Sequence, residues 1–349
     1  MKHAVRTISL VLALAVLAAG SAFANGTKES SAAAGAAKAP RIGVSLPTQA
    51  AERWVRDKEK MEAEFAKLGL NVKVQIANED AGRQISQCEN MFAQGLDVLI
   101  IAPHDAKAAA TIVEKAHAQG VKVISYDRLI LDSDVDLYLS FDNVKVGEIQ
   151  GQYLTKLMPK GNYAILAGAP TDNNAKLFRE GAMKYIQPLV DKGDIKIVAD
   201  QWVKDWANIE AMKIMENALT ANANRIDAVL APNDGTAGAC IEALAAQGLA
   251  GKVPVTGQDA ELAAAQRIVK GLQAMTVYKD TRELGAKAVE LAVMMARGQS
   301  IAGMINNKVS NGKIDVPSVL LTPVAVDKAN IDKVLIDGGY LRREDVYRK

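Results

Sequence analysis

The sequence predicts an α/β protein of two lobes, each built on a doubly wound parallel sheet. Ten short runs rich in Val, Ile and Leu recur along the chain, and most are continuous rather than alternating, as in strands buried on both faces. Segments with apolar residues at helical spacing lie between these runs. Such alternation is typical of parallel sheets with right-handed crossovers. About three hundred folded residues, with too many strands for one small sheet, favour two domains.

The expected strands divide into five for each sheet. The first five are 41–46, 72–78, 96–103, 121–127 and 136–142, and the next five are 162–170, 195–203, 226–234, 252–259 and 272–280. Between them, spacing such as that of Met61, Phe65 and Leu68 predicts amphipathic helices. Glycine often follows such a helix, as at Gly69 and Gly120, where a left-handed residue ends the helix.

The first residues have the features of a secretory signal peptide. Lys2 and Arg6 precede a short apolar run, and residues 22–24 form a small-x-small cleavage site. The run is short for a membrane span, so we expect cleavage and export rather than an anchor. The signal peptide then covers 1–24, and 25–40, rich in Ala, Ser and Gly, is expected to be a flexible tether.

The charge of the chain is balanced. It has 42 basic and 40 acidic residues, and cleavage after residue 24 removes two basic residues and no acidic one, which leaves a formal charge of zero. This balance argues against nucleic acid or anionic lipid as a partner.

Two cysteines, Cys88 and Cys240, are present, and in an exported protein they suggest a disulfide. We expect two buried thiols instead, because Cys88 lies on an apolar helix face and Cys240 lies in a small-residue helix of the other lobe.

Polar side chains gather where the expected strands end. Candidates in the first half are Arg53, Trp54, Asn78, His104, Asp105, Asp127, Arg128, Asp142 and Asn143; those in the second half are Asp172, Asn173, Asn174, Trp206, Asn233, Asp234, Gln258, Asp259 and Lys279. Ligands of open α/β sheets bind beyond the carboxyl ends of the strands. Asp and Asn at these places also cap helices. For a single residue the two interpretations are about equal, but capping does not account for Arg, Trp and Lys.

The composition of this set predicts a sugar as ligand. A hydroxyl donates one hydrogen bond and accepts two, so it suits carboxylates or amides on one side and Arg or Lys on the other. The apolar C–H face of a sugar ring packs on an indole. The stretch DQWVKDW (200–206) supplies Trp202 and Trp206 beside the expected cleft, and Trp54 supplies the opposite wall.

Other functional classes lack their motifs. A nucleophile elbow, a phosphate-binding loop and a metal-ligand cluster are missing from the sequence, so we expect no enzymatic activity, no cofactor and no metal. The acidic run DSDVD (132–136) lacks the glycine and the final glutamate of a calcium loop. A sugar-responsive repressor core would share the fold, but the signal peptide and the lack of a DNA-binding headpiece argue against it.

Several long stretches carry a family resemblance: ERW (52–54), QISQCENM (84–91), SFDNVKVGE (140–148), TDNNAKLFR (171–179) and DQWVKDW (200–206). In these the chain, from Arg41 nearly to its end, resembles the periplasmic xylose-binding proteins of bacterial ABC sugar importers. The resemblance implies a type I periplasmic binding protein fold with a three-segment hinge near Asn143, Asp280 and Pro317. The N-terminal lobe would then be 41–143 plus 281–316, and the C-terminal lobe 144–280 plus 317–349.

The same resemblance implies ten sugar contacts. Carried over residue by residue, they are Arg53, Trp54, Asp127, Arg128, Asp172, Asn174, Trp206, Asn233, Asp259 and Lys279. Trp202 would pack against its own lobe. The implied protein is a periplasmic monomer that captures a monosaccharide, D-xylose first, by lobe closure and delivers it to an ABC transporter permease. A chemoreceptor is a second candidate partner.

Part of the sequence departs from this pattern. Xylose-binding proteins usually have acidic residues where this chain has Pro47 and Thr48, and LPTQAAERW resembles instead multi-sugar proteins that bind glucose, galactose and arabinose. Multi-sugar binding is therefore the alternative function. His104 is also unusual; it either lines the pocket or caps a helix, and the general preferences of caps favour capping.

Overall fold

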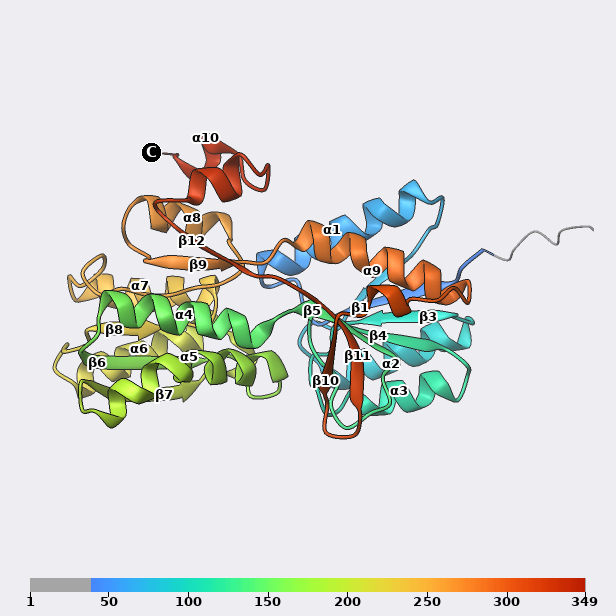
Figure 1. Cartoon of the computed structure of the whole chain (residues 1–349), viewed down its shortest axis with the longest axis horizontal. Coiled ribbons are helices and arrows are strands. Elements are labelled where there is room, and N and C mark those ends of the chain that lie inside the picture. The colour runs from blue at the N-terminus through green and yellow to red at the C-terminus, as the bar shows by residue number, and fades with distance from the viewer. Residues whose placement is uncertain (1–38, 349) are drawn as a thin grey trace, which may run out of the picture. The chain divides into compact units, whose positions relative to one another are not determined.

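The structure is a computed structural model that describes residues 39–348 (Figure 1). Residues Ala39–Lys349 form one compact unit. The expected signal peptide, and all but the last two residues of the expected tether, lie outside the described residues. Within 39–348, no helix combines the length and the apolar character needed to cross a membrane.

The first sheet has seven strands in the order β10-β11-β5-β4-β3-β1-β2. Their bounds are β1 Ile42–Leu46, β2 Val74–Ile76, β3 Val98–Ile101, β4 Lys122–Tyr126, β5 Leu137–Phe141, β10 Asn307–Ser310 and β11 Asp315–Leu321. Neighbouring strands are parallel except for the antiparallel pair β10–β11. Every residue of β1, β3 and β5 is buried, which explains why their sequences are continuously apolar.

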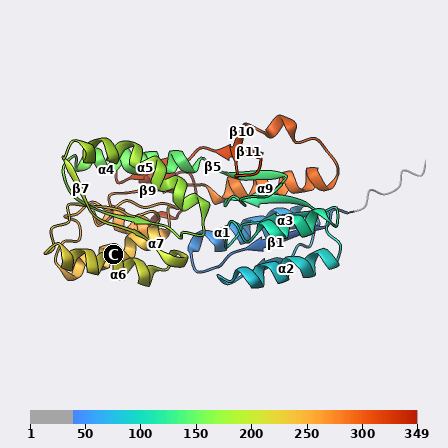
Figure 2. The ribbon, with the colours of Figure 1, turned by 90° about the horizontal axis from the view of Figure 1, so that it is seen from below.

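Helices cover both faces of this sheet (Figures 1 and 2). They are α1 Glu52–Lys67, α2 Ala81–Ala93, α3 Ala110–His117 and α9 Thr281–Ala296, with a short 3-10 turn at Ala302–Met304. Helices α1 and α9 bury Met61, Phe65 and Leu284 in one core, whereas α2 and α3 bury Phe92 and Ile112 in another. We call the elements of residues 42–142 and 281–321 the first lobe.

The second lobe, residues 143–280 and 324–346, is built on two smaller sheets. Strands β6 Gly161–Ala167, β7 Ile195–Trp202 and β8 Ala228–Leu230 form a parallel sheet in the order β7-β6-β8, and β9 Met275–Tyr278 pairs antiparallel with β12 Val324–Asp327. Segment 254–257 joins the two sheets, because Val229 donates to the Pro254 carbonyl (3.0 Å) and Val277 donates to the Gly257 carbonyl (3.0 Å).

Helices α4 and α5 lie together on one face of the three-stranded sheet, and α6 and α7 lie on the other (Figure 2). The helices of this lobe are α4 Asn143–Leu157, α5 Asn173–Asp191, α6 Asn208–Ala221, α7 Asp234–Ala246, α8 Leu262–Val269 and α10 Arg343–Val346, with single turns at Lys204–Trp206 and Asp332–Ile336. Among the described residues, no hydrophobic cluster combines buried side chains of both lobes.

The sheets differ from the expected division into five and five parallel strands. Strands β10, β11 and β12 were not expected, and two strand pairs are antiparallel. The expected strand 252–259 does not form a strand; it contributes the isolated bridge between Val229 and Val255 and the hydrogen bonds that join the two sheets. The third hinge crossing near Pro317 is also wrong: β11 stays paired with β5 as far as Leu321, because its side chains pack into the cores of the first lobe.

The two cysteines are free thiols, as expected. Cys88 is buried in a core of the first lobe and Cys240 in a core of the second. Burial raises the pKa of each thiol to about 12, so both stay protonated and inert at neutral pH.

Candidate functional site

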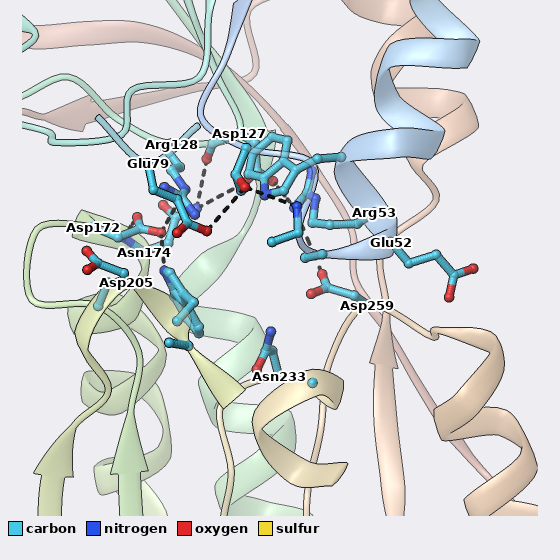
Figure 3. Close-up of a pocket in the computed structure, with 18 of the residues that line it drawn as sticks. Glu52, Arg53, Glu79, Asp127, Arg128, Asp172, Asn174, Asp205, Asn233 and Asp259 are labelled. Carbon is cyan, nitrogen blue, oxygen red and sulfur yellow. Dashed lines mark hydrogen bonds and ion pairs between the residues drawn. The ribbon is translucent and has the colours of Figure 1, made fainter. Parts of the chain in front are cut away.

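A cavity of about 410 Å³ lies where the strand ends of the two lobes face each other (Figure 3). Its volume is within the roughly 300–1,000 Å³ of small-molecule pockets. The lining includes all ten residues predicted from the sequence: Arg53, Trp54, Asp127, Arg128, Asp172, Asn174, Trp206, Asn233, Asp259 and Lys279. These ten are the contacts that the family resemblance implied. Of the eighteen strand-end candidates, eleven line the cavity, namely these ten and His104, whereas Asn78, Asp105, Asp142, Asn143, Asn173, Asp234 and Gln258 do not. A role in sugar binding stays a prediction.

Arg53 is fixed by carboxylates on two sides. It lies in the first turn of α1, and its Nε and Nη2 donate to Asp57 Oδ2 (3.1 and 2.8 Å), one turn later on the same helix. Its Nη1 donates to Asp127 Oδ1 (2.8 Å), and Tyr126 donates its hydroxyl to the other oxygen of Asp57. All four side chains are buried. The guanidinium is thus held in one orientation without any ligand.

Asp127 presents an ionised carboxylate at the end of β4. Its backbone is left-handed (φ 58°), and its carbonyl accepts from Ser140 Oγ (2.7 Å) and Asn174 Nδ2 (2.9 Å), which stabilises that turn. Burial raises the pKa of Asp127, but the charges of Arg53 and Lys279 outweigh it and hold that pKa at about 2. The carboxylate is therefore a hydrogen-bond acceptor at every physiological pH.

Asp172 joins the lobes and also caps a helix. Its Oδ2 pairs with Arg128 Nε of the first lobe (2.8 Å) and accepts from Trp206 Nε1 (3.1 Å). Its Oδ1 accepts from the Asn174 backbone N–H (2.9 Å) at the start of α5. The capping and pocket interpretations of this residue both hold.

Three groups of the second lobe offer unused hydrogen-bonding capacity. Lys279 Nζ lies 3.4 Å from Asp259 Oδ1 and 3.6 Å from Asp127 Oδ1. Asp259 Oδ1 is buried, yet it accepts no hydrogen bond from the described residues. Asn233 caps α7 by accepting from the Thr236 N–H (3.1 Å), which leaves its amide N–H groups available to the cavity. Such unsatisfied groups indicate a site shaped for a polar ligand.

Aromatic rings form two walls of the cavity. Trp54 is buried, with the guanidinium carbons of Arg53 and Arg128 lying 4.3 and 5.2 Å from its ring centroid. Trp206 meets Phe178 edge to face, at 6.4 Å between centroids and 65°. Phe178 also lines the cavity but was missed from the sequence, because its place on α5 has ordinary core spacing.

The position of Trp206 depends on the backbone around it. Asp205 and Trp206 are both left-handed (φ 53° and 59°), which turns the chain sharply after β7. The ring then lies against Gly168, where a Cβ would stand only 2.0 Å from the indole. Only glycine leaves room for this placement.

Trp202 differs from its prediction. It was expected to pack inside the second lobe, but it is 41% exposed. It is the last residue of β7, and β7 is an edge strand, so no further strand covers it. Of the two tryptophans in DQWVKDW, only Trp206 lines the cavity.

His104 also differs from the favoured interpretation. It lines the cavity, whereas the neighbouring Asp105 makes the turn hydrogen bonds, accepting from the N–H groups of Lys107 and Ala108 (2.9 Å each).

In the part of the chain that the structure describes, no group of three or more His, Cys, Asp or Glu side chains is placed to hold a metal ion.

Comparison with known proteins gives a consistent assignment. The family model described as a periplasmic binding protein domain matches residues 42–300. The D-xylose-binding periplasmic proteins of Haemophilus influenzae and Escherichia coli are each 48% identical to this chain, over 88% and 89% of it and 92% and 93% of their own lengths. A carbohydrate transporter solute-binding protein from Chloroflexus aurantiacus, solved in complex with D-glucose, superposes with a TM-score of 0.82 at 36% identity, over 88% of this chain and 98% of that one. Because the family model spans most of the chain, and relatives match it over nearly their whole length, this chain belongs to the periplasmic binding protein family.

Proposed function

We propose that this protein captures one monosaccharide in the cavity between its lobes and delivers it unchanged to an ABC transporter permease. D-xylose is the first candidate for this sugar. The observation that carries the proposal is the buried, pre-organised set of charges around Asp127, with an open acceptor on Asp259 and rings on two sides. The 48% identity to D-xylose-binding periplasmic proteins supports this sugar as the first candidate.

The hydrogen-bonding groups suit a ring with several hydroxyls. Asp127 and Asp259 accept from hydroxyls, while Arg128, Lys279 and Asn233 donate to hydroxyl oxygens. Trp54 and Trp206 would pack against the C–H faces of the ring. No covalent step is required of any of these groups.

Both lobes contribute contacts, and this couples binding to closure. Arg128 and Asp127 belong to the first lobe, and Asp172, Asn233 and Lys279 to the second. A sugar held by both sets binds the closed form more tightly than the open form and so shifts the population toward it. The permease would recognise the fixed spacing of the closed lobes, with the hinge at the crossings near Asn143, near Asp280 and after Leu321.

A second candidate function is binding of several sugars, including glucose, galactose and arabinose. It is favoured by Thr48, which lines the cavity where xylose-binding proteins usually carry acid. A multiple sugar-binding periplasmic receptor of Rhizobium radiobacter is 36% identical over 87% of this chain and 92% of that protein.

Calorimetric titration with xylose, glucose, galactose, arabinose and ribose separates the two candidates. Tight binding of xylose alone supports the first, and comparable binding of several sugars supports the second. Recovery of a chemically altered sugar after incubation would overturn both, since a transport protein leaves its ligand intact.

The cellular setting follows from the same proposal. The protein would act as a monomer in the periplasm, with the permease as its main partner and a chemoreceptor as a second one. Equal affinity of the permease for the sugar-free and the sugar-loaded protein would remove the proposed delivery mechanism.

A further inference from the structure

One end of the cavity is lined by polar side chains that are not among the ten predicted sugar contacts. They are Thr48, Glu79 and His104 of the first lobe and Thr171 and Asp205 of the second. In Figure 3, Glu79 and Asp205 lie beside Arg128 and Asp172, on the side of the cavity away from Asp259 and Glu52. We call this end the His104 end.

His104 and Asp205 face each other across the two lobes without touching. The distance from His104 Nε2 to Asp205 Oδ1 is 4.0 Å, which is too long for a hydrogen bond. The His104 side chain is 13% exposed and the Asp205 side chain 34%. Neither side chain forms a hydrogen bond with another described residue, so each keeps its full capacity for a ligand.

The missing partner has the chemistry of a hydroxyl. Burial and the charge of Arg128 lower the pKa of His104, so at neutral pH its ring has one N–H donor and one acceptor nitrogen. Atoms 4.0 Å apart can both lie about 2.8 Å from one shared oxygen. A hydroxyl there would donate to the Asp205 carboxylate and pair with the imidazole through its own oxygen.

The backbone at Asp205 supports a role in the site. Its φ of 53° is unusual for a residue with a side chain, and the following Trp206 is left-handed as well. Strain of this kind persists only where surrounding contacts enforce it, and it is common at ligand sites. The turn brings the carboxylate and the indole to the cavity together.

A pentose ring alone does not need this end. When the pentose ring lies between Trp54 and Trp206, its hydroxyls can reach the ten predicted residues. Among these residues, the Arg128–Asp172 ion pair lies outermost toward the His104 end. An aldohexose carries one more carbon outside the ring, with its own hydroxyl. We propose that His104 and Asp205 bind the exocyclic hydroxymethyl group of an aldohexose, so that the pocket accepts a hexose in addition to a pentose.

This inference rests on the proposed function, and the test separates the two. Xylose, glucose and 6-deoxyglucose are titrated calorimetrically into the parent protein and into the variants His104→Ala and Asp205→Gly. Glycine keeps the left-handed backbone at 205 while removing the carboxylate. His117→Ala is the matched control, because His117 lies on α3 outside the cavity and pairs with Asp136.

The parent should bind glucose about tenfold or more tightly than 6-deoxyglucose, as expected for a hydrogen bond to a charged group. Both cavity variants should lose this preference and keep their xylose affinity within threefold, whereas His117→Ala should change nothing. Melting of each sugar-free variant confirms that it is folded.

Binding of xylose without binding of glucose would overturn the subsite and leave the proposed function standing. So would equal weakening of xylose and glucose by His104→Ala and Asp205→Gly, or a parent that does not distinguish glucose from 6-deoxyglucose. Failure of the folded parent to bind any of the sugars would overturn the proposed function itself.

Discussion

Replacing Trp206 by alanine should weaken sugar binding and leave the fold intact. The ring lies in the turn after β7, where it donates to Asp172 and faces the cavity. Its backbone belongs to the single turn Lys204–Trp206 and not to a sheet. The indole is partly buried against Phe178, so its removal should also cost the sugar-free protein about 1–3 kcal/mol of folding free energy, no less than the loss of the more exposed Trp202.

The expected magnitude comes from one face of the indole. A tryptophan buries about 150–250 Å², and one face is less than half of that. At about 25 cal/mol per Å², covering this face contributes at most about 2–3 kcal/mol. Stacking geometry adds about 0.5–1.5 kcal/mol. A loss of about 2–4 kcal/mol corresponds to a fall in affinity of roughly 30- to 700-fold.

Trp202→Ala is the matched comparison, because both tryptophans lie in the same seven-residue stretch. At 41% exposure its removal should cost about 1–2 kcal/mol of folding free energy, less than the roughly 3–5 kcal/mol of a fully buried ring. The sugar affinity of Trp202→Ala should stay within threefold of that of the parent protein. Calorimetry and thermal melting of both variants provide the measurement. If Trp202→Ala lost binding while Trp206→Ala kept it, the assignment of the stacking ring would be refuted.

Three further predictions follow from the same contacts. Gly168→Ala places a Cβ 2.0 Å from the Trp206 ring, so it should weaken sugar binding about as much as Trp206→Ala; unchanged affinity in calorimetry would contradict this. Asp127→Ala removes the ionised acceptor and should cost about 2–4 kcal/mol of binding free energy in a dry cleft, so affinity within threefold of the parent would count against the site. Burial, then Asp234 and Asp259, raise the pKa of Glu261 to about 8. The pKa of Glu261 in the folded protein thus exceeds its unfolded value of about 4.3. The stability that Glu261 contributes is therefore fully present below about pH 4.3 and is lost as the pH rises from there through about 8. Glu261→Gln should therefore flatten the fall in Tm from pH 5 to 9, and a parent-like slope would refute the assignment.

The sequence predicted the parts of the site that depend on local pattern. Continuous apolar runs locate β1, β3, β4 and β5, and in a parallel sheet the residues after such runs must share one edge. That rule needs no knowledge of packing, and it is why Asp127 and Asn233 were placed at the cavity correctly. The two buried thiols were also predictable, because helical spacing alone decides which face a residue occupies.

Tertiary structure decided what depends on neighbours distant in sequence. Trp202 is exposed because β7 is an edge strand, and strand order is not a local property. Strand β11 reaches Leu321 because β5 pairs with it, although the two lie far apart in sequence. His104 faces Asp205 only because two lobes close around one cavity. Phe178 also lines this cavity, although its helix shows ordinary core spacing in the sequence. Local sequence fixes a residue's element and face, whereas contacts between elements determine what that face meets.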